Sequence, residues 1–195
     1  MKISWEVLLI GGGSGTGKSY LARQLSEHFK VPLSEVDDIR ISLQQIADKE
    51  KYPELFAFLN NANYQNEMDE NVFTQKLIGI GKVVWKSLKV LISKHAFLKE
   101  TIIFEGDGII PGLLKEIDLE KVKIIFLYDD LESIKERQLK RNRHGKISET
   151  VEKDALFAFT FNEAIREQAE ANGFTTIKAS PVETLFDRVL KEMER

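Results

Sequence analysis

The residues best suited to chemistry form a short glycine-rich run near the amino-terminal end of the sequence. The run has the spacing G-x-x-x-x-G-K-[ST] and consists of Gly12, Gly13, Ser14, Gly15, Thr16, Gly17, Lys18 and Ser19. Glycines let successive backbone N–H groups turn inward around a phosphate without steric clash. Lys18 can then reach β- and γ-phosphate oxygens, and the Ser19 hydroxyl can ligate Mg²⁺. Together with Tyr20, which follows directly, the run predicts a binding segment for a nucleoside triphosphate.

The neighbours of this run favour the same interpretation. The apolar run Val7–Ile10 precedes it, and Leu21, Leu25 and Phe29 follow at helical spacing. A strand, a glycine loop and a helix in this order place backbone N–H groups at a helix N-terminus, where anions bind. The alternative is a glycine-rich turn that binds nothing. A dinucleotide-binding fingerprint is excluded, because no register between Gly11 and Gly17 gives G-x-G-x-x-G.

A second group of candidate residues follows the expected second strand, near residues 34–37. Asp37 would lie across a cleft from the glycine loop, where a carboxylate can accept the proton of an attacking hydroxyl. The alternative for Asp37 is an N-cap of the next helix, although we expect Asp38 to be that cap. Arg40 could hold an anionic group of the phosphoryl acceptor, or it could be a solvated helix residue.

A third group follows the expected strand at residues 101–104. Glu105 and Asp107 are separated by one residue, so both carboxylates can face the same side of an extended segment. Acidic residues in this position orient metal-bound water or the attacking group, and we expect Mg²⁺ to be held by Ser19 with Glu105 or Asp107. Gly106 and Asp107 are also expected to contact the acceptor, because a glycine lets backbone approach a ligand closely. A plain turn with solvated acids is the alternative.

A basic segment between residues 135 and 148 is the last candidate. Six of its residues are cationic, namely Lys135, Arg137, Lys140, Arg141, Arg143 and Lys146. Phosphoryl transfer requires the charge on the transferred group to be neutralised, and arginines on a closing segment can do this while excluding water. We therefore interpret the segment as a lid in which Arg137 and Arg141 act in catalysis. A solvated helix face and an RNA-binding surface are the alternatives.

The elements that would position these residues can be read from hydrophobic periodicity. Strand-length apolar runs alternate with helical repeats, which predicts an α/β fold with a parallel sheet covered on both faces. Strand C-termini would then share one edge, where ligands bind. We expect one domain over residues 1–195, with an Asn-rich insert at 50–71, a kind of long irregular segment that is usually functional or mobile. The last helix is expected to open with Ser180-Pro181-Val182-Glu183 as a capping box.

Composition excludes several classes of protein. The net charge of −3 disfavours general affinity for nucleic acids or anionic membranes, and the absence of cysteine excludes disulfides and thiolate chemistry. No apolar run approaches the length of a membrane-spanning helix, and the glycine loop interrupts any signal-peptide core. We therefore expect a cytoplasmic protein with a small-molecule partner; oligomeric state is not readable from the sequence.

The motifs together resemble those of small bacterial P-loop kinases. The likeness rests on Gly12–Ser19, on Asp37-Asp38-Ile39-Arg40, on the run Glu105-Gly106-Asp107-Gly108-Ile109-Ile110-Pro111-Gly112 and on the basic segment. Among these kinases the sequence is most similar to proteins labelled 2-phosphoglycerate kinase-like. It is more distantly similar to shikimate kinase, gluconate kinase, chloramphenicol phosphotransferase and nucleoside monophosphate kinases. The resemblance implies a five-stranded parallel sheet in the order 2-3-1-4-5, an acceptor-binding helical insert and a lid. It also implies ATP with Mg²⁺ as the donor and Asp37 as base or acceptor anchor.

Other functions remain to be separated from a kinase that phosphorylates a small-molecule hydroxyl or phosphate. An ATP-hydrolysing regulatory protein would have extra partner-binding domains, for which 195 residues leave little room. A GTPase would carry an N-K-x-D motif, which this sequence lacks. A polynucleotide or nucleotide kinase could use the basic segment, although the net charge weighs against nucleic-acid binding. The Asn-rich insert matches no known substrate signature, so the sequence does not name the acceptor.

Overall fold

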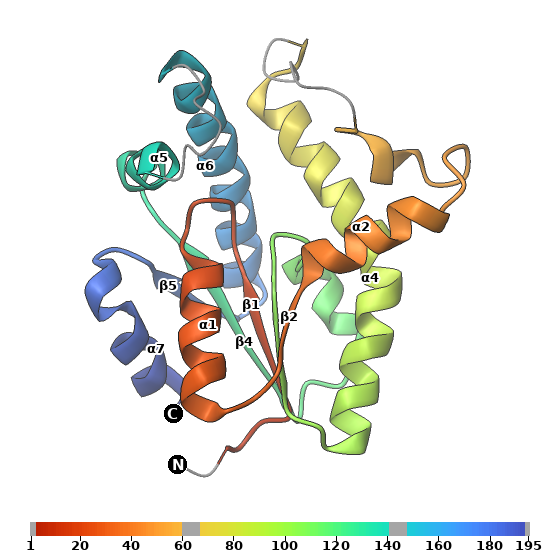
Figure 1. The fold of residues 1–195 in the computed structure, drawn as a ribbon, viewed down its shortest axis with the longest axis vertical. Helices are drawn as coiled ribbons and strands as arrows, with labels where there is room; N and C mark the ends of the chain where they lie inside the picture. The colour runs from red at the N-terminus through yellow and green to blue at the C-terminus, as the bar shows by residue number, and fades with distance from the viewer. Residues whose placement is uncertain (1–2, 60–66, 141–147, 194–195) are drawn as a thin grey trace.

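A five-stranded parallel sheet forms the centre of the molecule (Figure 1). The computed structural model describes residues 3–59, 67–140 and 148–193. The strands are β1 (Val7–Gly11), β2 (Leu33–Glu35), β3 (Ile102–Glu105), β4 (Val122–Tyr128) and β5 (Thr175–Lys178). Their spatial order is β2-β3-β1-β4-β5, and every neighbouring pair is parallel. The predicted fold class and strand order are therefore confirmed.

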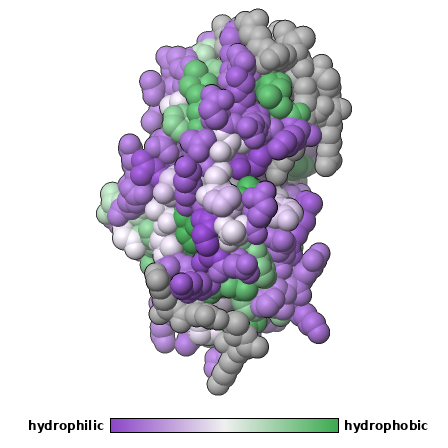
Figure 2. All heavy atoms as spheres, turned by 90° about the vertical axis from the view of Figure 1, so that its left-hand side faces the viewer, coloured by the Kyte–Doolittle hydropathy of each residue, from purple (hydrophilic) through white to green (hydrophobic). Residues whose placement is uncertain are grey.

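Helices cover both faces of this sheet (Figure 1). The described helices are α1 (Lys18–Phe29), α2 (Val36–Ile46), α4 (Glu70–Leu98), α5 (Leu131–Lys140), α6 (Ser148–Ala171) and α7 (Leu185–Met193). Three shorter 3₁₀ turns are η1 (Pro53–Phe56), η2 (Pro111–Glu116) and η3 (Val182–Thr184). The side of the molecule shown in Figure 2 is mainly hydrophilic, with hydrophobic residues in small separate groups. None of the helices in the described ranges combines the length and apolar character needed to cross a membrane.

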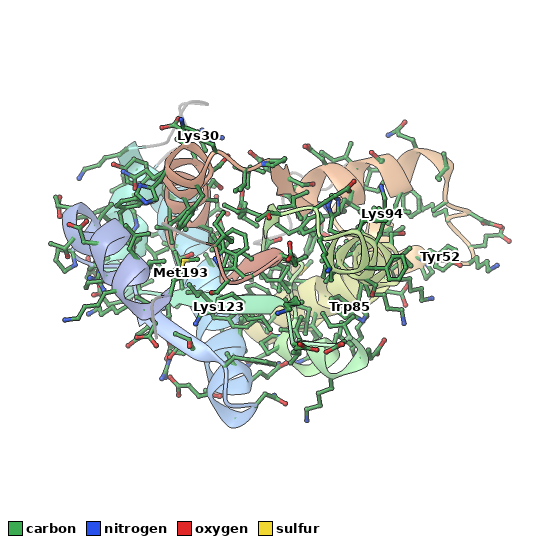
Figure 3. All side chains as sticks on the ribbon, turned by 90° about the horizontal axis from the view of Figure 1, so that it is seen from below. Lys30, Tyr52, Trp85, Lys94, Lys123 and Met193 are labelled. Carbon is green, nitrogen blue, oxygen red and sulfur yellow. The ribbon has the colours of Figure 1, made fainter. Side chains whose placement is uncertain are left out.

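Two hydrophobic cores lie on opposite faces of the sheet, because successive strand residues point to opposite sides. Val7 and Leu9 of β1 pack in the core beneath α4 and α6, whereas Leu8 and Ile10 pack in the core beneath α1 and α7. Trp85 belongs to the first core and Met193 to the second, and Figure 3 shows them in separate halves of the molecule. The fully buried β1 therefore holds the segment that follows it in a fixed position.

The carboxyl ends of β1, β2 and β3 are in register at one edge of the sheet. Ile10 pairs with Glu105, and Glu105 pairs with Glu35. Because paired residues of parallel strands point to the same face, the side chains of Glu35 and Glu105 are brought together at this edge. The loop between β1 and α1 lies at the same edge (Figure 1).

Two expected boundaries were wrong. β2 ends at Glu35 and α2 begins at Val36, so Asp37 lies in the first turn of a helix and not at the end of a strand. The N-cap of α2 is Glu35, which corrects the prediction that Asp38 caps the helix. The capping box at Ser180 is also absent: a 3₁₀ turn precedes α7, and the Ser180 hydroxyl instead donates to Asp129 Oδ2 at 2.7 Å.

The expected insert and lid are described only in part. Within the insert, η1 is anchored by the buried Leu55, and residues 70–71 already belong to α4. Residues 60–66 lie outside the described ranges. In the expected lid, Arg137 lies on α5, whereas Arg141, Arg143 and Lys146 fall outside the described residues.

Candidate functional site

The glycine loop leaves the buried strand β1 and turns directly into α1. Gly17 is the N-cap of α1 and has a φ of 90°, a left-handed conformation in which other residues are strained. No side chain caps this helix end, so its first N–H groups have no side-chain partner at the N-cap. A Cβ at Gly17 would meet nothing within 4 Å, so it is the backbone turn and not a lack of space that requires glycine. This geometry suits a backbone cradle for an anion.

Buried polar side chains fix the peptide of Gly13 at the back of the loop. The Gly13 carbonyl accepts hydrogen bonds from Thr16 Oγ1 at 2.8 Å and from Lys18 Nζ at 2.9 Å. The Gly13 N–H donates to Asn162 Oδ1 of α6 at 3.0 Å. Thr16 and Asn162 are fully buried, and Lys18 is 8% exposed. The loop is therefore held in place without a ligand.

A second set of contacts ties the front of the loop to α5. Arg137 donates from Nε to the Gly15 carbonyl and from Nη2 to Asp129 Oδ2. The Asp129 side chain has no exposed surface, and it also accepts a hydrogen bond from Ser180. The described contacts of Arg137 are thus with the glycine loop and with Asp129, directly after β4. Its expected catalytic role on a closing lid stays a prediction.

A cleft of about 190 Å³ opens in front of the loop. Its lining combines five loop residues with four carboxylates and one further glycine, namely Ser14, Gly15, Gly17, Lys18, Ser19, Glu35, Asp37, Glu105, Asp107 and Gly106. The loop, the start of α2 and the end of β3 therefore meet at one place. Asp37, Glu105 and Asp107 were each singled out from the sequence, and the fold brings them to one cleft with Lys18.

Two carboxyl groups of this cleft, those of Glu105 and Asp107, have raised pKa values. Burial raises the pKa of the Glu105 carboxyl above its ordinary value, with Lys18 and a hydrogen bond from Ser19 opposing the rise. Burial likewise raises the pKa of the Asp107 carboxyl, and the nearby negative charge of Asp37 adds to it. Desolvation destabilises the charged form of an acid, and neighbouring negative charge does the same. A positively charged ligand in this cleft would relieve both costs.

The α2 side of the cleft carries one ion pair. Arg40 Nη2 lies 3.3 Å from Asp37 Oδ1, and 52% of the Asp37 side chain is exposed. The Nε atom of Arg40 is buried without a hydrogen-bond partner among the described residues. Asp37 is accessible at the helix N-terminus, where the helix dipole favours a negative charge.

Some predicted residues lie differently from what the motif suggested. Tyr20 is 51% exposed on α1 and accepts a hydrogen bond from Gln24 at 3.3 Å, and it is not among the cleft-lining residues. Gly106 lines the cleft, but a Cβ there would approach Val36 Cβ to 2.7 Å. The glycine is therefore needed so that α2 can pack over the end of β3. Gly12 has a φ of 130° and lies against the backbone of Leu127.

The sequence interpretation missed three residues. Glu35 lines the cleft because β2 ends one residue before α2, and a correct boundary would have placed it there. Asp129 directly follows β4, so its position at the carboxyl end of a strand was the available signal. Asn162 could have been found as a polar residue within the apolar repeat of α6.

The residues present fit a nucleoside triphosphate and a divalent cation. The uncapped N-terminus of α1 and the buried Lys18 suit phosphate oxygens. Ser19 and Glu105 both line the cleft, and hydroxyl and carboxylate oxygens are ligands that Mg²⁺ prefers. Among the residues in the described ranges, no three acidic or histidine side chains gather to hold a metal alone. Phosphate oxygens and water would have to complete its coordination.

Two curated relatives are similar to this chain in sequence. The 2-phosphoglycerate kinase of Methanocaldococcus jannaschii is 22% identical over 190 residues, which cover 94% of this chain and 62% of that protein. The 2-phosphoglycerate kinase of Methanococcus maripaludis is 25% identical over 151 residues, which cover 73% of this chain and 48% of that protein. The chain thus spans less than two thirds of the length of these relatives. No family model matches it.

Solved structures show the same architecture. Shikimate kinase from Acinetobacter baumannii, solved in complex with shikimate, superposes with a TM-score of 0.56. The alignment covers 98% of this chain and 94% of that one at 15% sequence identity. A likeness at this identity concerns the fold. With the glycine loop between β1 and α1 and the strand order β2-β3-β1-β4-β5, this chain has the P-loop NTPase fold and resembles small P-loop kinases in its architecture.

Proposed function

We propose that this protein is an ATP-dependent kinase that transfers the γ-phosphoryl group, with Mg²⁺, to a hydroxyl or phosphate of a small molecule. The observation that carries the proposal is the cleft in which Lys18 and the loop backbone face Asp37, Glu105 and Asp107. Phosphoryl transfer needs cationic and N–H groups on the donor phosphates and a carboxylate near the attacking hydroxyl. The similarity to 2-phosphoglycerate kinases supports the same reaction class.

Each residue has a role that follows from its position. The backbone of the loop and Lys18 bind and orient the phosphates, and bound Mg²⁺ would supply further positive charge to the β- and γ-oxygens. Ser19 with Glu105 or Asp107 would hold that ion. Asp37 is accessible from the cleft and accepts or orients the acceptor's hydroxyl proton, while Arg40, paired with Asp37, anchors the acceptor.

The charges of the cleft bear on the choice of acceptors to test. Lys18 is the one cation among the described residues that line it, against four carboxylates. An acidic acceptor such as 2-phosphoglycerate would need further cations, for which Arg40 and the basic segment 135–148 are candidates. Uncharged polyols need none. The screen should therefore contain both classes.

The test is a measurement of ATP consumption and product mass with 2-phosphoglycerate, shikimate, gluconate, uncharged polyols, nucleosides and aminoglycosides, with and without Mg²⁺. We expect phosphorylation of one acceptor class, with little ATP hydrolysis when the acceptor is omitted. A Lys18→Ala variant serves as the inactive control. Rapid hydrolysis that no acceptor stimulates would instead indicate a regulatory ATPase and would contradict the proposal.

A further inference from the structure

Asn162 is a polar residue in an otherwise apolar stripe of α6. The stripe repeats at three and four residues through Ala155, Ala158, Ile165 and Ala169, each of them buried. Asn162 continues the same spacing and is itself 0% exposed. Helix packing alone favours an apolar side chain at such a position. The amide therefore needs another explanation.

Only one end of the Asn162 amide has a partner among the described residues. Its Oδ1 accepts the Gly13 N–H at 3.0 Å, whereas its Nδ2 is buried without a hydrogen-bond partner. An unpaired buried donor lowers stability, so this amide costs the fold more than an apolar residue of similar volume. The contact with the phosphate loop is the feature that offsets this cost.

The contact is close enough to constrain both partners. A Cβ on Gly13 would lie 2.8 Å from Asn162 Cβ and 3.0 Å from the Ala158 carbonyl. α6 and the loop can approach this closely only because residue 13 is glycine. Gly13 is thus held on both sides: Asn162 binds the N–H of the peptide that precedes its Cα, and Thr16 and Lys18 bind the carbonyl of the peptide that follows it.

The three hydrogen bonds to Gly13 respond differently when phosphate binds in the cleft. Lys18 Nζ has three donors, of which the Gly13 carbonyl takes one, and phosphate oxygens would compete for this cation. Asn162 and Thr16 then remain on Gly13. If the Asn162 oxygen were missing, the buried Gly13 N–H would lack an acceptor, and the peptide would rotate to find one. That rotation would move the neighbouring loop N–H groups away from the phosphates.

We propose that Asn162 is a positioning residue of the phosphate loop, which fixes the Gly13 peptide so that the loop N–H groups and Lys18 meet the β- and γ-phosphates. The inference rests on the proposed binding of ATP. It concerns a residue of α6, about 150 positions away from the loop in sequence. It predicts that Asn162 affects the phosphate-dependent part of nucleotide affinity and not the binding of the nucleoside.

The test is calorimetric titration of ATP and AMP into wild type and Asn162→Leu, which keeps volume and removes the acceptor. We expect ATP affinity to fall about tenfold or more while AMP affinity stays within about twofold, because the lost bond orders only the loop that holds the outer phosphates. An equal loss for both nucleotides, or no loss, would overturn the inference. If wild type binds neither nucleotide, the proposed function fails first.

Two further variants separate positioning from folding. Asn162→Asp keeps an acceptor facing Gly13 and is uncharged when protonated, so its ATP affinity relative to wild type should recover as the pH is lowered. A deficit that does not change with pH would contradict the inference. Thr74→Val is the matched control, because Thr74 is also a buried polar residue with an unpaired Oγ1, but on α4. It should leave the ratio of ATP to AMP affinity unchanged.

Discussion

The two sides of the cleft differ in burial and in charge. The donor side consists of the loop and the buried groups behind it, and its contacts are short hydrogen bonds between fully or mostly buried partners, namely Gly13, Gly15, Thr16, Lys18, Asp129, Arg137 and Asn162. The acceptor side consists of carboxylates and one arginine, namely Glu35, Asp37, Arg40, Glu105 and Asp107. There the described ion pair is partly exposed, and two carboxyl pKa values are raised.

This difference indicates which side of the cleft is already ordered before ligands bind. Every nucleoside triphosphate presents the same phosphates, so a rigid backbone cradle can be completed during folding. The acceptor side keeps negative charges close together, an arrangement that costs free energy until a cation or substrate compensates it. Substitutions on the donor side should therefore affect both stability and nucleotide binding. On the acceptor side, substitution of Asp37 should affect turnover alone.

Replacing Lys18 is the most severe test of the donor side. Lys18→Ala should lower phosphoryl transfer by at least about 10³-fold, because no other cation among the described cleft residues faces the phosphates. ATP affinity should also fall sharply. Turnover with a genuine acceptor and titration of ATP measure the two effects. Equal ATP affinity in wild type and variant would contradict the assignment of the donor side.

Replacing Asp37 tests the acceptor side. Asp37→Asn keeps the shape of the side chain and removes its charge, so turnover should fall about 10²–10⁴-fold, or about 3–5 kcal/mol of barrier. ATP affinity and the unfolding temperature should hardly change, because Asp37 is exposed and does not cap α2. Asp38→Asn is the matched control, since Asp38 is exposed in the same helical turn and does not line the cleft. Near-wild-type turnover in Asp37→Asn would move the search for the base to Glu105 and Asp107.

The sequence predicted the glycine loop of the donor side better than the buried groups that hold it. The loop is specified by local residues, and β1 and β4 were found because buried parallel strands are continuous apolar runs. β2 is three residues long and only partly buried, so its end was misplaced and the role of Glu35 was missed. Asn162 and Asp129 act through contacts over 149 and 51 positions, with Gly13 and Ser180. A local pattern can mark such a residue as unusual, but it does not identify its distant partner.

Removing Arg137 tests whether the donor side contributes to folding. Arg137→Ala would leave the Asp129 carboxylate, which has no exposed surface, without its cation. Breaking a buried pair in this way should lower the free energy of unfolding by about 3 kcal/mol. Arg166→Ala is the matched control, because Arg166 pairs with Glu163 and Glu170 near the surface of α6. Its removal should cost about 1 kcal/mol or less, as measured by denaturant unfolding. Equal losses would show that burial does not set the strength of the donor-side contacts.

The smallest effect is expected at Asp130, next to the buried Asp129 but half exposed. Asp130 accepts the Ser133 N–H and lies 3.1 Å from Lys178, and these contacts lower its pKa to about 2. Because the pKa is lower in the folded protein than the ordinary value of about 3.9, the stabilisation is present above about pH 4 and is lost as the pH falls toward 2. Asp130→Asn keeps an acceptor for Ser133 and removes the ion pair, so it should lower the free energy of unfolding by about 0.5 kcal/mol at pH 7, after allowance for solvent screening. That difference should disappear near pH 2 in denaturant titrations.

Asp118→Asn, in a surface turn whose aspartate accepts the Glu120 N–H, controls for the change from aspartate to asparagine itself. A loss at Asp130 as large as that in Arg137→Ala would mean that exposed charges on this edge hold the donor side as strongly as buried ones.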